Sequence, residues 1–303
     1  MSRRDGPTVH LIDGSVYIFR AYFSMPPMPD PGGQPVGAAY GFVNTLLKYV
    51  RDTRLTHLAV AFDHSMHSFR NAIEPEYKAQ RGEPPEDLSP QFPLCKEACE
   101  ALGLPAFEAK DFEADDVIAT LSRQLMRKGA RAVVVSSDKD LAQLVREDGR
   151  VVTHDLAREI TRDADGVREK FGVDPAQITD FLGLVGDTVD NLPGVPGVGP
   201  KSASAVLGHF GRIEDIPSDV ETWPEAARAS VRGAARLAQR VEEHRERALL
   251  TRELATLRAD VPGIRADLRQ LTWRGAYRDR AREFFDRLGW ERITSRVPAW
   301  RSG

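Results

Sequence analysis

Three short apolar runs, each followed by an aspartate, constrain the fold of this 303-residue chain more than any other feature. The runs are Val9–Ile12, Leu58–Phe62 and Ala132–Val135. The helix-like stretches between them are Ala38–Arg51, Pro93–Leu102 and Asp115–Lys128. Short apolar strands that alternate with helices predict βαβ units, and hence an α/β fold whose mostly parallel central sheet is flanked by helices on both faces.

The remaining segments suggest how this core is extended. Val151–Thr153 is a candidate further strand, and the pattern is mostly helical from Pro175 to the end. Two proline-rich segments, Ser24–Val36 and His64–Phe92, are predicted to be loops. A loop as long as the second is unusual inside a compact domain. It is therefore either a functional loop or a surface insertion.

Charge is distributed unevenly along the chain. The net charge is −3, but residues 221–303 hold 18 Arg and 12 Asp or Glu, which is +6 and leaves −9 for residues 1–220. An acidic N-terminal part is typical either of a soluble surface or of carboxylates gathered for metal. A basic C-terminal part is typical either of a solvated helical surface or of a surface that meets phosphates.

Several classes of protein are disfavoured. No apolar run approaches the roughly 20 residues that span a bilayer, and the N-terminus lacks a signal-peptide core, so we expect a cytoplasmic protein with no membrane partner. The two cysteines, Cys95 and Cys99, lie four residues apart in a helix-like stretch. That spacing suits neither a structural disulfide nor a zinc site, and predicts reduced packing residues.

Carboxylates follow each of the three predicted strands. Asp13 follows the first, Asp63 the second, and Asp138 with Asp140 the third. Ligands of an open parallel sheet bind beyond the carboxyl ends of its strands, so we expect these side chains to converge at one edge. A single aspartate after a strand has a plain alternative, because Asp is common in turns and helix caps. Three strands out of three favour a shared site.

Two further acidic groups extend the set. Glu113, Asp115 and Asp116 crowd the predicted start of a helix, where capping and the helix dipole also favour acids. Asp187 and Asp190 lie three residues apart. Converging carboxylates would raise one another's pKa unless divalent cations bind them. Because no histidine or cysteine ligands cluster with them, Mg²⁺ or Mn²⁺ is favoured, and two such ions would cleave phosphodiesters.

A glycine-rich segment, PGVPGVGPKSASA at residues 193–205, is a candidate phosphate-binding hairpin. Gly194, Gly197 and Gly199 would let the backbone approach a phosphate, and Lys201 and Ser202 stand at the start of a predicted helix. The alternative is a tight turn without a ligand. A nucleotide-binding P-loop is excluded, because Pro200 stands where that motif needs glycine.

These motifs resemble the FEN-type 5′ nucleases, most closely the 5′-nuclease domain of bacterial DNA polymerase I and its free-standing relatives. The matching segments, in the family's order, are LIDGSVYIFRAY, AAYGFVN, AFDHSMHSFRNAIEPEYKAQR, FEADDVIATL, SSDKDLAQLV and LVGDTVDNLPGVPGVGPKSA. The resemblance implies a PIN-like nuclease core over residues 1–185, with an arch over the active site at about 64–92. Residues 186–303 would form a helix–three-turn–helix and a C-terminal helical DNA-binding region.

The resemblance also assigns roles to residues. It implies two divalent metal ions held, directly or through an outer layer of ligands, by Asp13, Asp63, Glu113, Asp115, Asp116, Asp138 and Asp140, with Asp187 and Asp190 at the second metal. Contacts with the scissile phosphate and the 5′ strand are implied for Arg20, Arg70, Tyr77, Lys78 and Arg81. Lys78, Arg20, Asp138 and Asp115 would be catalytic, and Tyr77 could stack a base. The family's hairpin grips duplex DNA and commonly holds K⁺.

The activity implied is that of a structure-specific 5′ nuclease in replication and repair, both 5′–3′ exonuclease and flap endonuclease. Its substrates would be DNA with a 5′ flap, overhang or nick, or an RNA primer in a DNA hybrid, and a DNA polymerase in trans is a candidate partner. Two other classes stay open: a structure-specific DNA-binding protein with little catalysis, and a ribonuclease on a related acidic scaffold. The glycine hairpin disfavours the ribonuclease.

Overall fold

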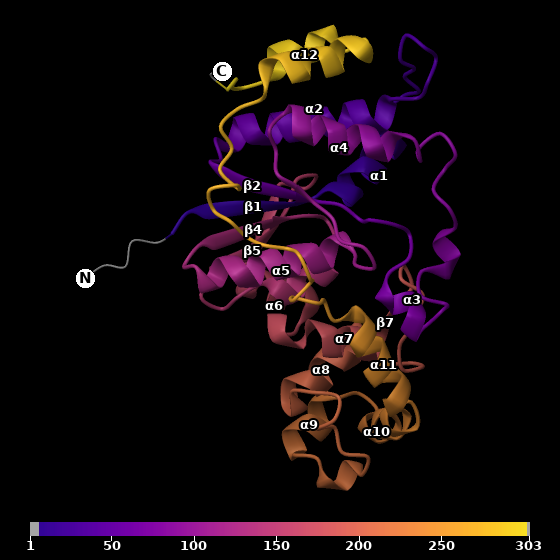
Figure 1. Ribbon diagram of the computed structural model, residues 1–303. Helices are drawn as coiled ribbons and strands as arrows, with labels where there is room; N and C mark the ends of the chain where they lie inside the picture. Colours follow the sequence, from indigo (N-terminus) through magenta and orange to yellow (C-terminus); the bar gives the residue numbers. More distant parts are fainter. Residues whose placement is uncertain (1–5, 302–303) are drawn as a thin grey trace, which may run out of the picture.

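The computed structural model describes residues 6–301 and contains a six-stranded sheet at the centre of the N-terminal part (Figure 1). The strand order is β3-β2-β1-β4-β5-β6, and neighbouring strands are parallel except for β5 and β6. The strands are β1 Thr8–Asp13, β2 His57–Ala61, β3 Ala106–Phe107, β4 Arg131–Val135, β5 Val151–Asp155 and β6 Ile160–Arg162. The expected mostly parallel sheet is confirmed, and β3 and β6 are short edge strands that the sequence pattern did not reveal.

Helices cover both faces of the sheet. They are α1 Gly14–Ser24, α2 Gly37–Thr53, α4 Gln91–Ala101 and α5 Ala114–Arg127. Two short helices lie outside these layers (Figure 1): α3 Phe69–Ile73, and α6 Ala164–Phe171, whose Ala164 and Val167 pack in the core of the helices that follow it. Side chains of β1 alternate between the faces, as in any strand. Ile12 packs in the core with α1, α2 and α4, whereas Val9 and Leu11 pack in the core with α5. The three predicted helices are confirmed within two residues, but α1 was not predicted.

A second group of helices has a core of its own. It consists of α7 Ile178–Val185, α8 Pro200–Phe210, α9 Glu225–Ser230, α10 Ala234–Glu243 and α11 Arg245–Ala255, with the two-stranded β7 Gly186–Asp187 and β8 Leu192–Pro193. We call this group the helical unit (Figure 1). Phe181 and Leu182 of α7 pack with Leu207 and Trp223 in this core. Helix α7 therefore packs with the helices that follow it, although the expected boundary at 185/186 grouped it with the α/β core.

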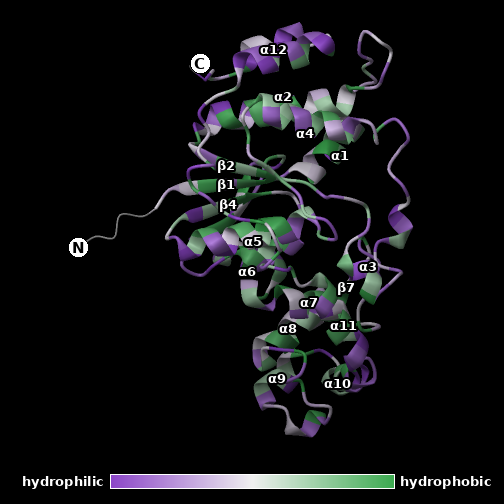
Figure 2. Ribbon diagram, in the orientation of Figure 1, coloured by the Kyte–Doolittle hydropathy of each residue, from purple (hydrophilic) through white to green (hydrophobic). Residues whose placement is uncertain are grey.

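The chain after α11 returns to the sheet, which differs from the expected helical DNA-binding region over 186–303. Leu271 O accepts a hydrogen bond from Leu58 N of β2 at 2.9 Å. The last helix, α12 Arg278–Arg287, lies beyond α2 and α4 and buries Phe284 and Phe285 in their core (Figure 1). Its outward face is hydrophilic (Figure 2). The last part of the chain is thus a cover of the α/β core, because its aromatic residues need apolar partners.

The proline-rich segment at 64–92 is ordered by contact with the turn between β7 and β8. Lys78 N donates to Asp190 O at 3.0 Å, and Asn191 Nδ2 donates to Glu76 O at 2.7 Å. The segment includes α3 and a 3₁₀ turn at Ala79–Arg81. These bonds tie the segment to the helical unit, whereas the alternative of a disordered surface insertion predicts no such contacts.

Two smaller expectations concern cysteines and membranes. Cys95 and Cys99 are buried and free, as expected. Between residues 6 and 301, no helix combines the length and the apolar character needed to cross a membrane.

Candidate active site

The aspartates that follow β1, β2 and β4 emerge from adjacent strands at one edge of the sheet. β1 lies between β2 and β4, and the register pairs Asp13 with Ala61. Asp13 Oδ2 accepts a hydrogen bond from Ser136 Oγ at 2.8 Å, and that hydroxyl accepts one from Asp138 N at 3.0 Å. One serine therefore connects the acidic ends of β1 and β4.

The acidic end of β2 positions the helix that carries the next carboxylates. Asp63 Oδ1 accepts a hydrogen bond from Ala114 N, the first residue of α5, at 2.8 Å. Glu113 caps this helix, and Asp115 and Asp116 lie in its first turn. A carboxylate at a helix N-terminus satisfies an otherwise free N–H group and interacts favourably with the helix dipole. Strand β2 thus brings Asp115 to the edge where Asp13 and Asp138 lie.

Burial and mutual repulsion act on this first group of carboxylates. Burial, with Asp63 and Asp138 nearby, raises the pKa of Asp13 to about 7. Burial and the charges of Asp138 and Asp13 raise the pKa of Asp115 well above its usual range. Burial and Glu113 raise the pKa of Asp63. A divalent cation among these carboxylates would favour their charged forms and so oppose the rise in pKa. We call Asp13, Asp63, Asp115 and Asp138 the first carboxylate group.

A second carboxylate group consists of Asp140, Asp187 and Asp190. All three are buried, and one carboxylate oxygen of each lies within 4.8 Å of the others. Asp140 Oδ1 is buried and has no hydrogen-bond partner among residues 6–301. Burial and Asp138 raise the pKa of Asp140. An unsatisfied buried carboxylate oxygen beside two others is a donor set that suits a hard divalent cation.

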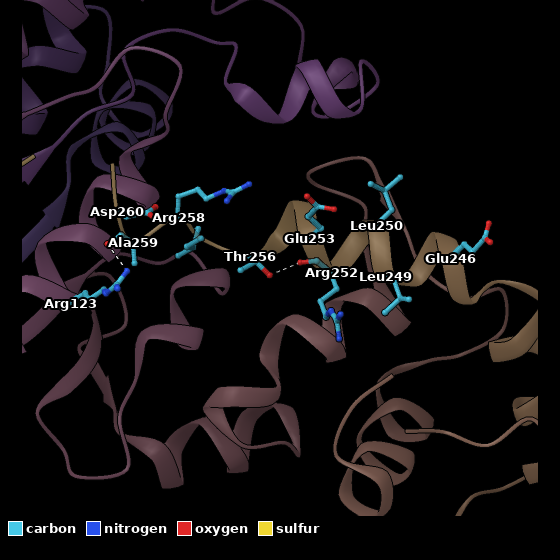
Figure 3. A pocket seen from close by; sticks show the side chains of 11 residues that line it. Arg123, Glu246, Leu249, Leu250, Arg252, Glu253, Thr256, Arg258, Ala259 and Asp260 are labelled. Carbon is cyan, nitrogen blue, oxygen red and sulfur yellow. Dashed lines mark hydrogen bonds between the residues drawn. The ribbon is translucent and has the colours of Figure 1, made fainter. Parts of the chain in front are cut away.

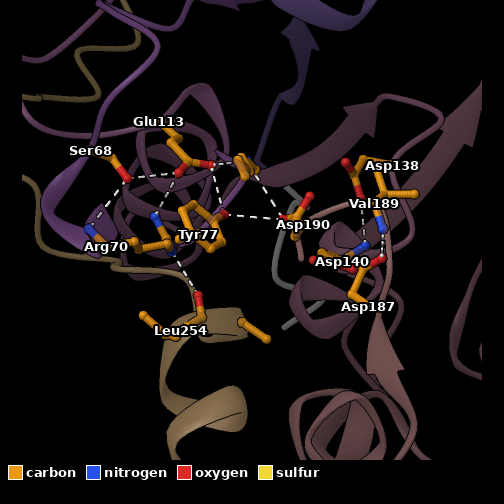
Figure 4. A network of polar contacts seen from close by, with 12 residues as sticks. Ser68, Arg70, Tyr77, Glu113, Asp138, Asp140, Asp187, Val189, Asp190 and Leu254 are labelled. Carbon is orange, nitrogen blue, oxygen red and sulfur yellow. Dashed lines mark hydrogen bonds and ion pairs between the residues drawn. The ribbon is translucent and has the colours of Figure 1, made fainter. Parts of the chain in front are cut away.

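Lys78 and Arg81 of the 64–92 segment lie against Glu113 and Asp190, two carboxylates that Figure 4 shows on either side of Tyr77. Lys78 Nζ lies 2.6 Å from Glu113 Oε2 and 3.6 Å from Asp190 Oδ2. Arg81 Nη2 lies 2.5 Å from Asp190 Oδ1. Burial alone would raise the pKa of Glu113, but the charges of Lys78 and Arg70 lower it to about 2. The backbone of Lys78 is left-handed, with φ 57°, and this rare conformation positions the ammonium between two acids.

A cavity of about 490 Å³ opens beside these cations. Asp63, Glu113, Lys78 and Arg81 line its polar side. Phe23, which is 77% exposed, lines its apolar side with Phe19, Met66 and two prolines of the 64–92 segment. The cavity therefore combines carboxylates, cations and exposed aromatic surface, which suits a nucleotide with its phosphate.

Comparison with protein families supports the same chemistry. Residues 8–172 match the N-terminal resolvase-like domain of 5′-3′ exonucleases, and residues 173–279 match the C-terminal SAM fold of 5′-3′ exonucleases. The chain belongs to the 5′-3′ exonuclease family. The two matches meet at 172/173, between α6 and α7.

Relatives of two lengths share this family. The 5′-3′ exonuclease of Aquifex aeolicus is 39% identical over 216 residues, which is 71% of this chain and 74% of that protein. DNA polymerase I of Bacillus caldotenax is 36% identical over 292 residues, or 95% of this chain but 32% of the polymerase. DNA polymerase I of Rhizobium leguminosarum is 41% identical over 267 residues, 86% of this chain and 25% of the polymerase. The chain spans about a third or less of these polymerases.

Solved structures share the fold. A mutant of T5 5′-exonuclease superimposes with a TM-score of 0.63 at 21% identity, covering 94% of this chain and 99% of that one. The catalytic core of Rad2 in complex with DNA superimposes with a TM-score of 0.64 at 16% identity, covering 97% and 92%. The expected nuclease fold with a C-terminal helical domain is confirmed.

In this family member, two expected roles need correction because the side chains of Arg70 and Tyr77 are buried. Arg70 is 1% exposed and binds both oxygens of Asp116, so it does not face a DNA strand. Asp116 is 0% exposed and its oxygens also accept from Glu113 N and Arg258 N, which favours the outer-layer alternative that was left open for this residue. Tyr77 is 4% exposed, which excludes base stacking; its hydroxyl contacts Asp190.

Arg20 lies apart from the two carboxylate groups. It is exposed on α1 and lines a different cavity of about 490 Å³, with Lys48, Tyr49 and His154. The structure therefore does not bring Arg20 beside Lys78, as a shared contact with the scissile phosphate would require.

The glycines of the hairpin have different surroundings. A Cβ on Gly194 would lie 2.3 Å from the carbonyl carbon of Val185, so this glycine is required by packing within the helical unit rather than by a ligand. A Cβ on Gly197 would lie 1.9 Å from Arg240 Nη1. A Cβ on Gly199 would meet nothing within 4 Å, and Lys201 is exposed. Among the hairpin residues, Gly197 and Lys201 are exposed and Gly199 and Ser202 are half-buried, so these four are open to a phosphate.

Another cavity, of about 850 Å³, runs along α11 and the segment that follows it (Figure 3). Arg123, Arg252, Arg258, Glu253 and Asp260 line it, and Arg123 Nη1 donates to Ala259 O at 3.4 Å. None of its lining residues belongs to either carboxylate group.

Sequence reasoning missed three residues of the site. Ser136 connects Asp13 with Asp138, Lys139 Nζ lies 2.5 Å from Asp187 Oδ2, and Arg240 covers Gly197. Lys139 stands between two predicted metal ligands in the sequence, which was a usable signal. Arg240 had none, because its contact with Gly197 depends on the packing of α10 against the hairpin.

Proposed function

We propose that this chain is a metal-dependent 5′ nuclease that hydrolyses phosphodiesters at or near a DNA 5′ end and releases a 5′-phosphate. The observation that carries the proposal is that the first carboxylate group and the buried second group lie together beside Lys78 and Arg81, at the edge of a cavity large enough for a nucleotide. The family membership and the Aquifex aeolicus relative named 5′-3′ exonuclease agree with it.

The first carboxylate group would hold one divalent ion and the second group another. Oxygen-only donors favour Mg²⁺ or Mn²⁺ over zinc. When bound, two such ions would activate water and stabilise the charge on the leaving oxygen. Ser136 and the N-terminus of α5 orient the first group, which saves the cost of arranging its side chains during the reaction. A T5 D15 protein was crystallised with metal ions, which supports this assignment.

Lys78 and Arg81 would act on the scissile phosphate. Lys78 now pairs with Glu113, which lines the cavity, and Arg81 pairs with Asp190 of the second carboxylate group. A phosphate that enters the cavity would offer this ammonium and this guanidinium a new anionic partner. Their charge would then lie where negative charge grows in the transition state. Arg20 would contact the 5′ strand farther from the reacting bond, since it is exposed on α1.

The helical unit would hold duplex DNA on the side away from the reacting end. Gly199, Ser202 and Lys201 face outward at the start of α8, where N–H groups favour phosphate. A K⁺ ion at this hairpin, a 5′ flap or RNA primer as substrate, and a DNA polymerase in trans all belong to this proposal. The DNA-bound Rad2 core has a similar fold, which supports DNA as the ligand.

One incubation tests the proposal. Labelled 5′-flap DNA, nicked duplex and a matched single-stranded RNA are incubated with the protein, with and without Mg²⁺. We expect cleavage of both DNAs near the 5′ junction only with Mg²⁺, and product lengths report the balance of exonuclease and flap cuts. Binding without cleavage would favour a DNA-binding protein, and cleavage of the RNA alone would favour a ribonuclease.

A further inference from the structure

Arg70 is buried where three separate parts of the chain meet. Its Nη1 and Nη2 donate to the two oxygens of Asp116, each at 2.8 Å, and its Nε donates to Leu254 O at 2.7 Å. Nη2 also donates to Thr256 O at 3.2 Å, and Figure 4 shows the bond from Arg70 to Leu254. Only an arginine side chain offers this planar fork together with a third donor on its side. The guanidinium thus joins α3, the first turn of α5 and the end of α11.

Each of these three parts carries a different piece of the nuclease. The chain from α3 reaches Lys78 eight residues after Arg70. Asp116 is the neighbour of Asp115 in the first carboxylate group. Helix α11 belongs to the helical unit, where Thr251 Oγ1 donates to Pro193 O at 2.9 Å, next to the glycine hairpin. Arg70 is therefore the contact shared by the arch, the metal-binding edge and the element that carries the duplex grip.

The contact is rigid as well as central. Arg70 is 1% exposed, and Asp116 is 0% exposed. Both oxygens of Asp116 are fully used, since they also accept from Glu113 N at 3.1 Å and from Arg258 N at 2.8 Å. Breaking a buried, hydrogen-bonded pair leaves an uncompensated charge, so the three parts cannot shift separately without a large cost.

We propose that Arg70 is a positioning residue that sets the distance between the duplex grip and the reacting bond. Through Asp116 and α11, it determines where along the DNA Lys78 and the carboxylates stand, and so which phosphodiester is cut. This inference rests on the proposed function. Arg70 touches neither the substrate nor the metals, because its donors are occupied inside the protein.

The chain offers a matched control. Arg247 Nη1 pairs with Glu74 Oε2 at 2.5 Å, which joins α11 to the end of α3 as Arg70 does. The side chain of Arg247 is 38% exposed, whereas that of Arg70 is 1% exposed. An exposed pair adds little stability. Loss of Arg247 therefore removes a contact between the same two elements while the buried fork remains.

The test is the product-length distribution from end-labelled 5′-flap DNA with Mg²⁺, under single-turnover conditions, beside flap affinity in Ca²⁺. We expect wild type and Arg247→Met to cut mainly one bond. Arg70→Lys, which keeps the charge but lacks the fork, should spread the cuts to neighbouring bonds and slow the reaction about tenfold to a hundredfold, while flap affinity changes less than threefold. Asp116→Asn should spread the cuts in the same way, and the two changes together should add little to either alone.

Outcomes separate this inference from the function on which it rests. If wild type leaves flap DNA intact with Mg²⁺, the proposed function fails. If wild type cuts one bond and both Arg70→Lys and Asp116→Asn cut that bond alone, the positioning role is wrong. Partial unfolding does not confuse the result, because only folded molecules cut and the distribution is a ratio of their products. If Arg247→Met also spreads the cuts to neighbouring bonds, the specific role of Arg70 is wrong, because any contact between α3 and α11 would then position the cut.

Discussion

Lys139 Nζ lies 2.5 Å from Asp187 Oδ2. In the sequence, Lys139 stands between Asp138 and Asp140, so a lysine flanked by two predicted metal ligands forms an ion pair with a third. Asp187 is buried, whereas the side chain of Lys139 is 34% exposed. The second carboxylate group also has Lys78 and Arg81 against Asp190. In the first group, no ion pair within 4.0 Å joins Asp13, Asp63, Asp115 or Asp138 to a cation of residues 6–301. The two groups therefore differ in how much of their charge the protein itself neutralises.

Removal of Lys139 should strengthen metal binding at the second group. Lys139→Met keeps the length of the side chain but removes a positive charge that competes with a divalent ion for Asp187. In calorimetric titration with Mn²⁺, we expect the dissociation constant of the second carboxylate group to be severalfold lower in Lys139→Met than in wild type. The thermal gain in stability on adding Mn²⁺ should be larger than in wild type, because binding to the folded state stabilises it. An unchanged dissociation constant at the second carboxylate group would mean that the Lys139 ammonium does not compete with the metal ion for Asp187.

Asp115→Asn and Asp138→Asn should each lower turnover by orders of magnitude while the fold persists. Both residues belong to the first carboxylate group, whose charges hold the proposed metal. In EDTA, Asp115→Asn should be slightly more stable than wild type, because burial and Asp138 disfavour the charged form of Asp115. Flap cleavage with Mg²⁺ and thermal melting in EDTA measure the two effects. Near-normal cleavage by either variant would remove that residue from the metal site.

Lys78→Ala should slow the chemical step more than it weakens binding. The Lys78 ammonium borders the cavity, and a cation that meets charge developing in the transition state contributes mainly to the rate. We expect the single-turnover rate to fall about a hundredfold or more, by the magnitude typical of losing one electrostatic stabiliser. Flap affinity in Ca²⁺ should change less than the rate. Equal losses in both measurements would make Lys78 a docking contact.

The sequence pattern predicted the strands and the convergence of the carboxylates because both depend on local periodicity. Val9–Ile12 and Ala132–Val135 are apolar enough to be buried on both faces, and parallel strands bring Asp13 and Asp138 to one edge. Helix α1 was missed because Asp13 ends a strand and caps the following helix at once, so no loop separates the two elements. The positions of site residues were thus predictable where the end of a strand places the side chain.

Residue type did not reveal which arginines face DNA. The motif around Arg70 suggested an exposed cation that contacts DNA. Its partners, Asp116 and Leu254, lie 46 and 184 residues away in the sequence, so their contacts with Arg70 could not be predicted from the motif. The same holds for the C-terminal part, where an excess of arginine suggested a DNA surface. Phe284 and Phe285 instead bury one side of α12 against α2 and α4, and that contact depends on tertiary packing alone.

Stability should fall as the pH falls from about 6.5 to about 4, in part because of His10. Burial, with His154 nearby, lowers the pKa of His10 to about 4, and Tyr49 Oη lies 2.7 Å from its Nδ1. Above pH 6.5 the imidazole is neutral in both the folded and the unfolded chain, so His10 does not lower the free energy of unfolding there. Between 6.5 and 4 the unfolded chain binds the proton first, and unfolding becomes easier by up to about 3 kcal/mol.

Urea unfolding of wild type and His10→Gln between pH 7.5 and 4.5 measures this contribution. The glutamine can still bond Tyr49 but does not titrate in this range. The free energy of unfolding of wild type should drop more steeply with falling pH than that of the variant. Parallel curves would show that His10 is solvated enough to bind its proton in the folded state.

The hairpin before α8 allows the packing role of a glycine to be separated from a phosphate-binding role. Gly194→Ala should destabilise the fold, since its Cβ would lie 2.3 Å from the carbonyl carbon of Val185. Gly199→Ala should leave the melting temperature nearly unchanged, because φ at Gly199 is −97° and a Cβ there meets nothing within 4 Å. If a DNA backbone approaches Gly199, the added methyl group should still weaken duplex binding. Lys201→Ala should weaken binding to all sequences and flatten the slope of log affinity against log salt by about one unit.

Titration of each variant against flap, plain duplex and single-stranded DNA over a salt series decides between these roles. Lys201 is exposed and lies at the start of an 11-residue helix, so its ammonium and the helix N–H groups can meet neighbouring phosphates. Losses confined to the two DNAs that contain duplex would support a backbone grip by Gly199 and Lys201, because the carboxylate edge alone suffices for a free 5′ end. An unchanged salt slope in Lys201→Ala, with normal duplex affinity in Gly199→Ala, would make the hairpin a structural turn. The grip would then lie on other cations of the helical unit, such as Arg240, whose guanidinium lies beside Gly197.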